Sequence, residues 1–362
     1  MKKIVAFHLY NDFSGSPKAL KTVLEELLVR GYSVDLYTSA GGVLDSLSDY
    51  ENCRITHCRY RFSENSLKTI LSFFIVQITI FFKAFRYLTD KNCVFYINTI
   101  MPVGAAAAAR LMKKKLVYHY HENAYIRGRM YRILARCMEA WADRIMCVSA
   151  YQSSFLSRSE GVVVIPNALE ASFISQLQPD IDAAYERKTV LVLSSLKEYK
   201  GLIEFFQLAA MNPQLSFVAV INDTDENIEE FISKHKLVVT PNLTYHSRQQ
   251  NVARFYNKAS LSLNLTRKTE AVETFGLTAL EAMSNALPVI VPTVGGIAEM
   301  VENDVNGYKI DVEELDKISE KISLILSDSE LYNRLAGNAI ETSGKYSLNN
   351  AIQQIEMIIN KI

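Results

Sequence analysis

The order of apolar and polar positions predicts alternating strands and helices along the first half of the chain. A short apolar run at 4–9 is followed by a polar turn, Pro17 and a stretch up to Gly31 in which apolar residues recur at helical spacing. A second strand is expected at 33–37. The other elements predicted before residue 169 are strands at 94–98, 116–120, 145–148 and 162–165 and a helix at 105–112. A strand–helix–strand repeat is typical of a parallel sheet with helices on its faces.

The alternation starts again in the second half. Residues 169–188 lack strong periodicity and include Pro179, so they are predicted to be a linker. Beyond it we expect strands at 189–193, 216–221, 260–265 and 289–291 and helices at 200–210, 225–235, 250–259 and 276–285. The pattern predicts an α/β fold with two doubly wound domains, at 1–168 and 189–346. A helix at 347–362, with apolar residues along one face, is expected to join the first domain.

One apolar run stands out at 69–82, between Lys68 and Lys83. At about 14 residues it is shorter than the ~20 that a membrane-spanning helix needs, so we do not expect a span. We expect a helix buried in the first domain. The alternative is an interfacial helix that lies in a lipid surface, which the neighbouring Lys83 and Arg86 favour.

Composition indicates a globular protein, since 49% of the 362 residues are hydrophobic and 22% are charged. The formal net charge is zero, but its distribution is uneven. Residues 1–168 carry 22 Lys and Arg and 13 Asp and Glu, a net +9, whereas the rest carries 17 and 26, a net −9. A basic first half suits an anionic membrane surface or merely a solvated face. No nucleic-acid-binding motif is present, so we expect no nucleic-acid partner.

The cysteines and the start of the chain indicate a compartment. The five cysteines form no C-x-x-C pair, and metal-ligand spacing is absent, so we expect reduced thiols and no metal site. Met1-Lys2-Lys3 runs directly into the first predicted strand, without a signal-peptide pattern. We therefore expect a cytoplasmic protein, peripheral at the inner face of the plasma membrane where its basic half binds lipid.

Two glutamates bracket the start of a predicted helix. Glu273 lies in the loop after the strand at 260–265, Gly276 marks the helix start, and Glu281 lies about one and a half turns into the helix. The unpaired N–H groups and the positive dipole end of a helix N-terminus favour a phosphate. Because carboxylates accept hydrogen bonds from hydroxyls, the pair can hold two polyols that flank a diphosphate. The alternative is that both glutamates only solvate a helix start.

The same stretch resembles a known family. Glu273 and Glu281 fit the E-x7-E signature of retaining glycosyltransferases with the GT-B fold, and the wider stretch 273–310, with its Gly295-Gly296 turn, is similar to glycosyltransferase family 4. The resemblance covers most of 140–310. It implies two Rossmann-like domains that face a cleft, with acceptor binding at 1–168 and nucleotide-sugar binding at 189–346.

The resemblance also implies roles for matching residues. Glu273 would bind hydroxyls of the donor sugar, Glu281 would bind the ribose, and Lys200 would neutralise the leaving diphosphate. The backbone amides expected to face the sugar and diphosphate are those of Phe275, Gly276 and Leu277. A nucleotide-diphosphate sugar is then the donor substrate, and neither metal nor cofactor is required. Asp223-Thr224-Asp225 has the D-x-D spacing of metal-dependent transferases of another fold, but we expect it to cap a helix.

One position departs from the family pattern. Ser195 stands where the family has an arginine, so one of two cationic groups at the diphosphate is missing. Arg267 or Lys268 could replace it from the loop before Glu273, and this is the explanation that we favour. Alternatively, Lys197 could turn towards the phosphate, or the enzyme is weak or inactive.

In the first half, His121-Glu122 resembles the family's His-Asp/Glu pair. The resemblance implies that His121 points into the cleft near the reacting sugar, with His119 as the alternative. A purely structural histidine is the other interpretation. Gly15, in the loop 11–16, weakly matches the glycine-rich loop that approaches donor and acceptor in this family.

The reaction implied by the resemblance is glycosyl transfer with retention, in which a donor phosphate oxygen takes the acceptor's proton. Basic residues beside the apolar run at 69–82 lead us to expect a lipid-linked oligosaccharide acceptor in bacterial surface polysaccharide biosynthesis. The alternatives are a GT-B-fold sugar-nucleotide epimerase or hydrolase and a degenerate, non-catalytic partner of an active transferase.

Overall fold

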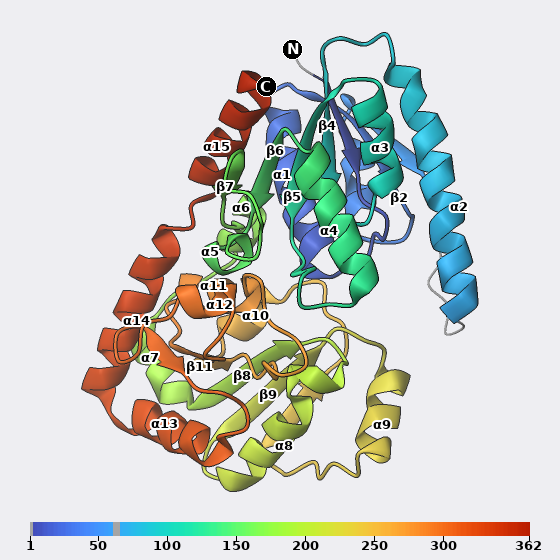
Figure 1. Cartoon of the computed structure of the whole chain (residues 1–362). Coiled ribbons are helices and arrows are strands. Elements are labelled where there is room, and N and C mark those ends of the chain that lie inside the picture. The colour runs from blue at the N-terminus through green and yellow to red at the C-terminus, as the bar shows by residue number, and fades with distance from the viewer. Residues whose placement is uncertain (1–2, 61–65) are drawn as a thin grey trace. The chain divides into compact units, whose positions relative to one another are not determined.

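Two parallel sheets, one in each half of the chain, organise the fold (Figure 1). The structure is a computed structural model that describes residues 3–60 and 66–362. Contacts divide the chain into unit 1, Met1–Ala168 with Leu348–Ile362, and unit 2, Leu169–Ser347. Each unit has helices around its sheet, which confirms the predicted α/β class with two Rossmann-like domains.

Unit 1 is built on a sheet whose described strands run in the order β3-β2-β1-β4-β5-β6-β7, all parallel. The strands are β1 (Lys3–Phe7), β2 (Ser33–Thr38), β3 (Cys53–His57), β4 (Cys93–Asn98), β5 (Lys115–Tyr120), β6 (Arg144–Cys147) and β7 (Val162–Val164). The helices are α1 (Gly15–Val29), α2 (Ser66–Ala84), α3 (Val103–Leu111), α4 (Arg129–Trp141), α5 (Ala150–Ser153) and α15 (Leu348–Lys361), with 3-10 turns η1 (Val43–Asp49) and η2 (Phe85–Tyr87).

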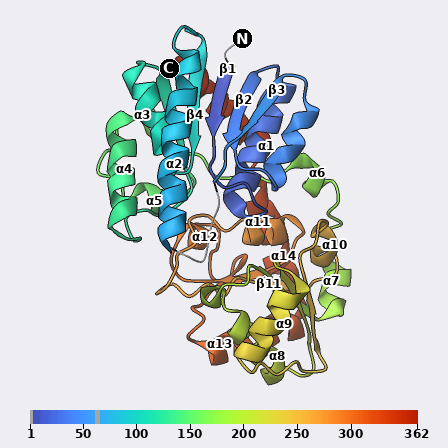
Figure 2. The same cartoon turned by 90° about the vertical axis from the view of Figure 1, so that its right-hand side faces the viewer.

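The strands of this sheet are apolar on both faces because each face has its own core. In β1, Ile4 and Ala6 face the core formed with α1 and α15, whereas Val5 and Phe7 face the core formed with α2, α3 and α4. Figure 2 shows α2, α3 and α4 on one side of β1 and α1 on the other. Burial on both faces explains the continuous apolar runs by which these strands could be predicted.

The last helix of the chain, α15, packs on unit 1. Its buried residues Ile352, Ile355 and Ile359 join the core that also contains Leu20 and Leu24 of α1. At the surface, Arg30 at the end of α1 donates to Glu356 of α15 at 2.6 Å. The 3.6-residue spacing of these isoleucines is the apolar stripe that the sequence shows.

Unit 2 is built on a second parallel sheet, with the described strands in the order β10-β9-β8-β11-β12-β13. The strands are β8 (Thr189–Ser194), β9 (Ser216–Ile221), β10 (Leu243–His246), β11 (Leu261–Leu263), β12 (Val289–Val291) and β13 (Gly307–Lys309). The helices are α6 (Ala171–Ile174), α7 (Ile181–Arg187), α8 (Leu202–Met211), α9 (Asp225–Lys234), α10 (Ala253–Tyr256), α11 (Leu277–Ser284), α12 (Gly296–Glu299), α13 (Leu315–Ser327) and α14 (Ser329–Gly344), with the turn η3 (Glu198–Lys200).

The stretch 169–188 is not the linker that its weak periodicity predicted. It belongs to unit 2 and contains α6 and α7. Ala184 is buried, its carbonyl accepts a hydrogen bond from the Ser260 hydroxyl at 2.5 Å, and the Tyr185 ring lies 5.3 Å from that of Tyr332. Helices of four and seven residues are too short to show a helical period, which is why the sequence pattern missed them.

Helix α2 is longer and more exposed than the sequence predicted. It spans 19 residues rather than about 14, so Lys68 and Lys83 lie within it instead of bounding it. The expectation of a buried helix is wrong for its outer face, since Leu71 and Phe74 are 60% and 58% exposed. The segment Leu67–Tyr87 is the one helix among the described residues that is long and apolar enough to cross a membrane.

Candidate functional site

Lys200 and Glu273 form an ion pair at the carboxyl edge of the sheet of unit 2. Lys200 follows β8 and Glu273 follows β11, and these strands are neighbours and parallel. The two loops therefore leave the sheet at the same edge, where open α/β sheets bind their ligands. The structure thus brings together two residues that are 73 positions apart in the sequence.

Gly201 explains how the lysine loop comes so close to β11. It has a φ of +75°, and a Cβ at this position would clash with the carbonyl oxygen of Leu265. Glycine is favoured here both because the left-handed conformation is unstrained for it and because it leaves room for the neighbouring backbone. The close approach places Lys200, the preceding residue, beside Glu273.

Glu273 is held by backbone and side-chain contacts. Its carboxylate accepts hydrogen bonds from Lys200 and from the Thr266 hydroxyl, the latter at 3.1 Å, and its carbonyl accepts one from the Gly296 amide at 2.8 Å. Burial alone would raise the pKa of Glu273, but the charge of Lys200 and the hydrogen bonds from Lys200, Thr266 and Asn264 lower that pKa below its ordinary value. Glu273 is therefore a carboxylate at neutral pH, able to accept hydrogen bonds.

Helix α11 begins immediately after this carboxylate, as predicted, with Gly276 as its N-cap. Gly276 has a φ of +92°, and a Cβ there would clash with Ile297. The Phe275 side chain is buried, with its ring 5.7 Å from that of Tyr346, so only its backbone is available at the helix tip. The first hydrogen bond of the helix runs from the Ala279 amide to the Gly276 carbonyl at 3.1 Å, so the N–H groups of Leu277 and Thr278 precede it and form a site suited to an anion.

Glu281 lies on α11 and is fixed by Tyr256, a residue that the sequence analysis did not select. The Tyr256 hydroxyl donates to Oε2 of Glu281 at 2.6 Å. Burial, together with the nearby charge of Glu281, raises the pKa of Tyr256 well above its ordinary value, so the phenol remains protonated and donates. Tyr256 lies at the end of α10, and nothing in its local sequence shows which residue its hydroxyl meets.

Arg267 and Lys268, the two residues expected to replace the missing arginine at Ser195, are engaged elsewhere. Ser195 follows β8 and is half-buried. Arg267 donates to Glu204 at 2.5 and 3.0 Å and to Glu270 at 3.0 Å, and Lys268 pairs with Asp311 at 2.5 Å. The structure therefore gives no support to Arg267 or Lys268 as the substitute for the family arginine. Lys197, the remaining candidate, is exposed on the same loop as Ser195.

The D-x-D sequence caps a helix, as predicted. Thr224 is the N-cap of α9 and its hydroxyl accepts from the amide of Asn227 at 3.4 Å. Asp223 accepts from the Asn227 side-chain amide at 2.6 Å. These contacts satisfy donors at the start of the helix, which accounts for the residue types without a ligand.

In unit 1, His121 lies in a buried hydrogen-bond network at the carboxyl ends of β1, β4 and β5. The Asn98 side-chain nitrogen donates to Nδ1 of His8 at 3.0 Å, and the Asn98 oxygen accepts from Nε2 of His121 at 2.9 Å. An amide oxygen can only accept, so His121 carries its proton on Nε2 and its Nδ1 is the acceptor nitrogen.

The histidines of this network are neutral. Burial is the main cause that lowers the pKa of His121 well below its ordinary value, and the neighbouring His119 and His8 add to the effect. Burial lowers the pKa of His8 to about 4 and that of His119 to about 3. Next to His121, burial raises the pKa of the Glu122 carboxyl. The group can therefore position a hydroxyl but cannot supply a positive charge near pH 7.

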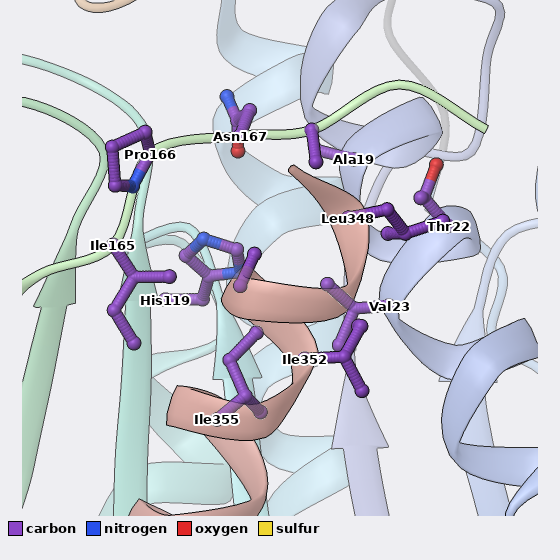
Figure 3. A pocket seen from close by; sticks show the side chains of 12 residues that line it. Ala19, Thr22, Val23, His119, Ile165, Pro166, Asn167, Leu348, Ile352 and Ile355 are labelled. Atoms are coloured by element: carbon purple, nitrogen blue, oxygen red, sulfur yellow. The ribbon is translucent and has the colours of Figure 1, made fainter. Parts of the chain in front are cut away.

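His119, the alternative to His121, faces a small cavity of about 10 Å³ against the C-terminal helix (Figure 3). Ile165, Ile352 and Ile355 line the same cavity. A volume of this size holds roughly one water molecule, so the cavity cannot admit a sugar. Gly15, the other predicted residue of unit 1, is exposed at the first position of α1.

Two family models match the chain. The model described as Glycosyltransferase Family 4 matches residues 13–173, and the model described as Glycosyl transferases group 1 matches residues 174–342. The chain belongs to glycosyltransferase family 4. The boundary between the models falls inside unit 2, five residues past its start.

Curated relatives of this family 4 protein match over part of their length. N-acetyl-alpha-D-glucosaminyl L-malate synthase from Bacillus anthracis is 25% identical over 179 residues, which are 47% of this chain and 44% of the relative. Poly(glycerol-phosphate) alpha-glucosyltransferase from Bacillus subtilis is 29% identical over 99 residues, 27% of this chain and 15% of the relative. The chain thus spans less than half the length of these relatives.

A solved structure matches the whole chain. HepE from Anabaena, crystallised with UDP-glucose, has a TM-score of 0.81 and 19% identity, and each chain is covered completely. Identity at this level shows the fold, which is GT-B. Family and fold together make this protein a GT-B glycosyltransferase of group 1.

Proposed function

We propose that this glycosyltransferase is a retaining, metal-independent hexosyltransferase whose donor, a nucleotide-diphosphate sugar, binds to unit 2. The observation that carries the proposal is the meeting of Lys200, Glu273 and the N-terminus of α11 at one edge of the sheet. A cation, a carboxylate and a helix tip are the three groups that an activated sugar requires. The binding of UDP-glucose by HepE supports a donor of this class.

Each group has a separate part in the proposed reaction. Lys200 and the first-turn amides of α11 offset the charge that develops on the leaving diphosphate. Glu273 accepts hydrogen bonds from hydroxyls of the transferred sugar, and Glu281, oriented by Tyr256, accepts them from the ribose. Because Lys200 already orders the Glu273 carboxylate, little reorganisation is needed when the donor binds.

The proposed transfer step proceeds with retention. The acceptor oxygen bonds to the anomeric carbon on the face from which the diphosphate departs, the carbon–oxygen bond to phosphate breaks, and the hydroxyl proton moves to a phosphate oxygen. Double displacement would instead require a carboxylate free to reach the anomeric carbon. Glu273 is already bound by Lys200 and Thr266, which favours the single step. The names of both curated relatives specify an α-linked glycosyl group, the outcome of retention from an α-linked donor.

The acceptor in this proposal is a lipid-linked glycan used in bacterial surface polysaccharide synthesis, and unit 1 binds it at the cytoplasmic face of the membrane. His121 would orient the acceptor hydroxyl, and the exposed N-terminus of α1 at Gly15 would lie close by. The basic surface of unit 1 supports an anionic glycolipid more than a neutral free sugar.

The test is turnover of UDP-, GDP- and dTDP-hexoses with a lipid-linked acceptor, with the anomeric configuration of the product read by NMR. We expect one donor to be consumed only with acceptor present and the new linkage to keep the donor's configuration. Glu273→Gln should remove turnover, whereas Glu270→Gln, a control on the same loop, should not. An inverted product refutes retention, and donor consumption without acceptor indicates an epimerase or hydrolase.

Ser195 favours a second candidate, a degenerate transferase that serves as a non-catalytic partner. With no arginine at this position and Arg267 bound to Glu204, Lys200 is the cation placed beside Glu273 in the described residues. This candidate predicts nucleotide-sugar binding with no turnover across all acceptors. The active enzyme predicts turnover that Lys200→Met lowers by about a hundredfold or more.

A further inference from the structure

An exposed apolar stripe covers the outer face of α2. The stripe is formed by seven side chains that are between 49% and 77% exposed: Leu67, Ile70, Leu71, Phe74, Ile75, Ile78 and Phe82. They recur at three- and four-residue intervals and extend for about 22 Å along the helix axis. Monomeric soluble proteins rarely expose a continuous apolar surface of this kind unless it binds something.

The inner face of α2 holds the helix against unit 1. Phe73, Val76 and Ile80 are buried in the core that α2 shares with the sheet. The Gln77 side chain accepts from the Gly104 amide at 2.8 Å and donates to the Met101 carbonyl at 3.1 Å, and a Cβ at Gly104 would clash with the Gln77 backbone. A helix packed this closely on α3 would lose a large part of the core if it left to span a bilayer, so it lies along the protein surface.

The charges of unit 1 are concentrated on the same side of its sheet. Helices α2, α3 and α4 together carry six Lys and Arg but one Asp or Glu. The helices on the other side, α1 and α15, carry three of each kind. The net positive charge of unit 1 is therefore not spread evenly over a solvated surface.

Helix α4 combines both features. Arg129, Arg132 and Arg136 are exposed on it, beside Met130 and Ile133, which are 48% and 60% exposed. It packs on α3, which in turn packs on α2, so the three helices form one layer over the sheet (Figure 2). Apolar and basic side chains thus alternate over one helical layer.

We propose that this α2–α3–α4 layer is an interfacial membrane surface that binds bilayers containing anionic lipid. The outer stripe of α2 enters the boundary between headgroups and acyl chains with its axis parallel to the membrane, and the basic side chains contact lipid phosphates. Neither feature suffices alone, since stable peripheral attachment takes an apolar and an electrostatic contribution together. A second copy of this chain does not fit, because two such layers would bring like charges together.

The inference rests on the proposed function only in the reason for membrane binding, which is to place unit 1 where a lipid-linked acceptor is found. The experiment is flotation of the full chain with vesicles of phosphatidylcholine alone or mixed with phosphatidylglycerol, without donor or acceptor. We expect flotation with the mixed vesicles, weakened by salt. Protein that stays at the bottom of the gradient with both vesicle types overturns the proposal.

Variants separate the two contributions. Phe74→Ser, Ile78→Ser and Phe82→Ser combined should weaken vesicle binding by about tenfold or more. A matched control combines Val29→Ser and Met357→Ser, which replace exposed apolar residues of α1 and α15 on the other side of the sheet and should leave binding unchanged. Arg129→Glu, Arg132→Glu and Arg136→Glu combined should remove the preference for phosphatidylglycerol.

Two further readouts keep the outcomes distinct. The α2 variant should keep the thermal shift produced by nucleotide sugar, and both it and the wild-type protein should be monomeric. A wild-type dimer that the α2 variant disrupts and the control variant does not would mean that a second copy covers the stripe. Wild-type protein should be released from vesicles by alkaline carbonate, and resistance to it would mean that α2 spans the bilayer. For the wild-type protein, absence of flotation together with donor binding refutes this surface alone, whereas flotation without donor binding refutes the proposed function alone.

Discussion

Replacing Lys200 by methionine tests the ion pair around which the proposed donor site is built. The side chains of Lys200 and Glu273 are 23% and 20% exposed, so the pair is largely but not fully removed from water. Methionine keeps the length and apolar stem of lysine but leaves the Glu273 carboxylate with the Thr266 hydroxyl as its main remaining partner. Burial then acts on Glu273 without an opposing charge, and its pKa rises.

The expected cost lies between two limits. Breaking a fully buried pair costs about 3–5 kcal/mol, and an exposed pair is worth about 0.2–1 kcal/mol. For a pair that is about one-fifth exposed we expect a loss of roughly 2 kcal/mol, which would lower the melting temperature of unit 2 by about 4–8 °C. Turnover should fall by about a hundredfold or more, because the leaving diphosphate loses its cation.

The assay is a double-mutant cycle by calorimetry with Lys200→Met, Glu273→Gln and the double variant. The double variant should be more stable than the sum of the two single losses predicts, because it leaves no unpaired charge. Glu273 has a lowered pKa in the folded protein, so its stabilising contribution is present above its ordinary pKa and is lost as the pH falls through the folded value. Strictly additive losses, with unchanged acid sensitivity in Lys200→Met, would refute the reasoning.

Two further predictions concern single contacts. Tyr256→Phe removes the hydroxyl that donates a hydrogen bond to Glu281 at 2.6 Å, so nucleotide-sugar binding measured by isothermal titration should weaken by about 1–2 kcal/mol. Unchanged affinity would exclude Tyr256 as a positioning residue. His8, His119 and His121 have lowered pKa values in the folded protein, so below about pH 6.5 the unfolded chain binds more protons than the folded chain. The stability of unit 1 should therefore fall as the pH drops from about 6.5 to about 4. A melting temperature that stays constant over that range would contradict the conclusion that these histidines are buried and neutral.

Much of the fold could be predicted because the central strands are buried on both faces. Continuous apolar runs such as β1 and β9 mark these strands in the sequence. The strands that pattern reasoning missed, β3, β10 and β13, lie at sheet edges, where polar side chains are common, or are three residues long. Helix α4 was also missed, although Leu134, Ala135 and Met138 recur at helical spacing on its buried face.

The candidate site also has one part that the sequence shows and another part that only the folded chain shows. Glu273, Gly276 and Glu281 lie within one short stretch, so their spacing and the helix start are visible in the sequence. The partners of these residues are not, because Lys200, Thr266 and Tyr256 reach them through the tertiary fold. Sequence reasoning also proposed a free Arg267, and only the folded chain shows the carboxylates of α8 and the loop that bind it.

The most direct measurement of the central claim is a crystal structure of the chain soaked with UDP-glucose. The account predicts diphosphate density beside Lys200 and the first turn of α11, the sugar against Glu273 and the ribose on Glu281. Nucleotide density at any other edge of unit 2, with the Lys200–Glu273 pair undisturbed, would contradict it.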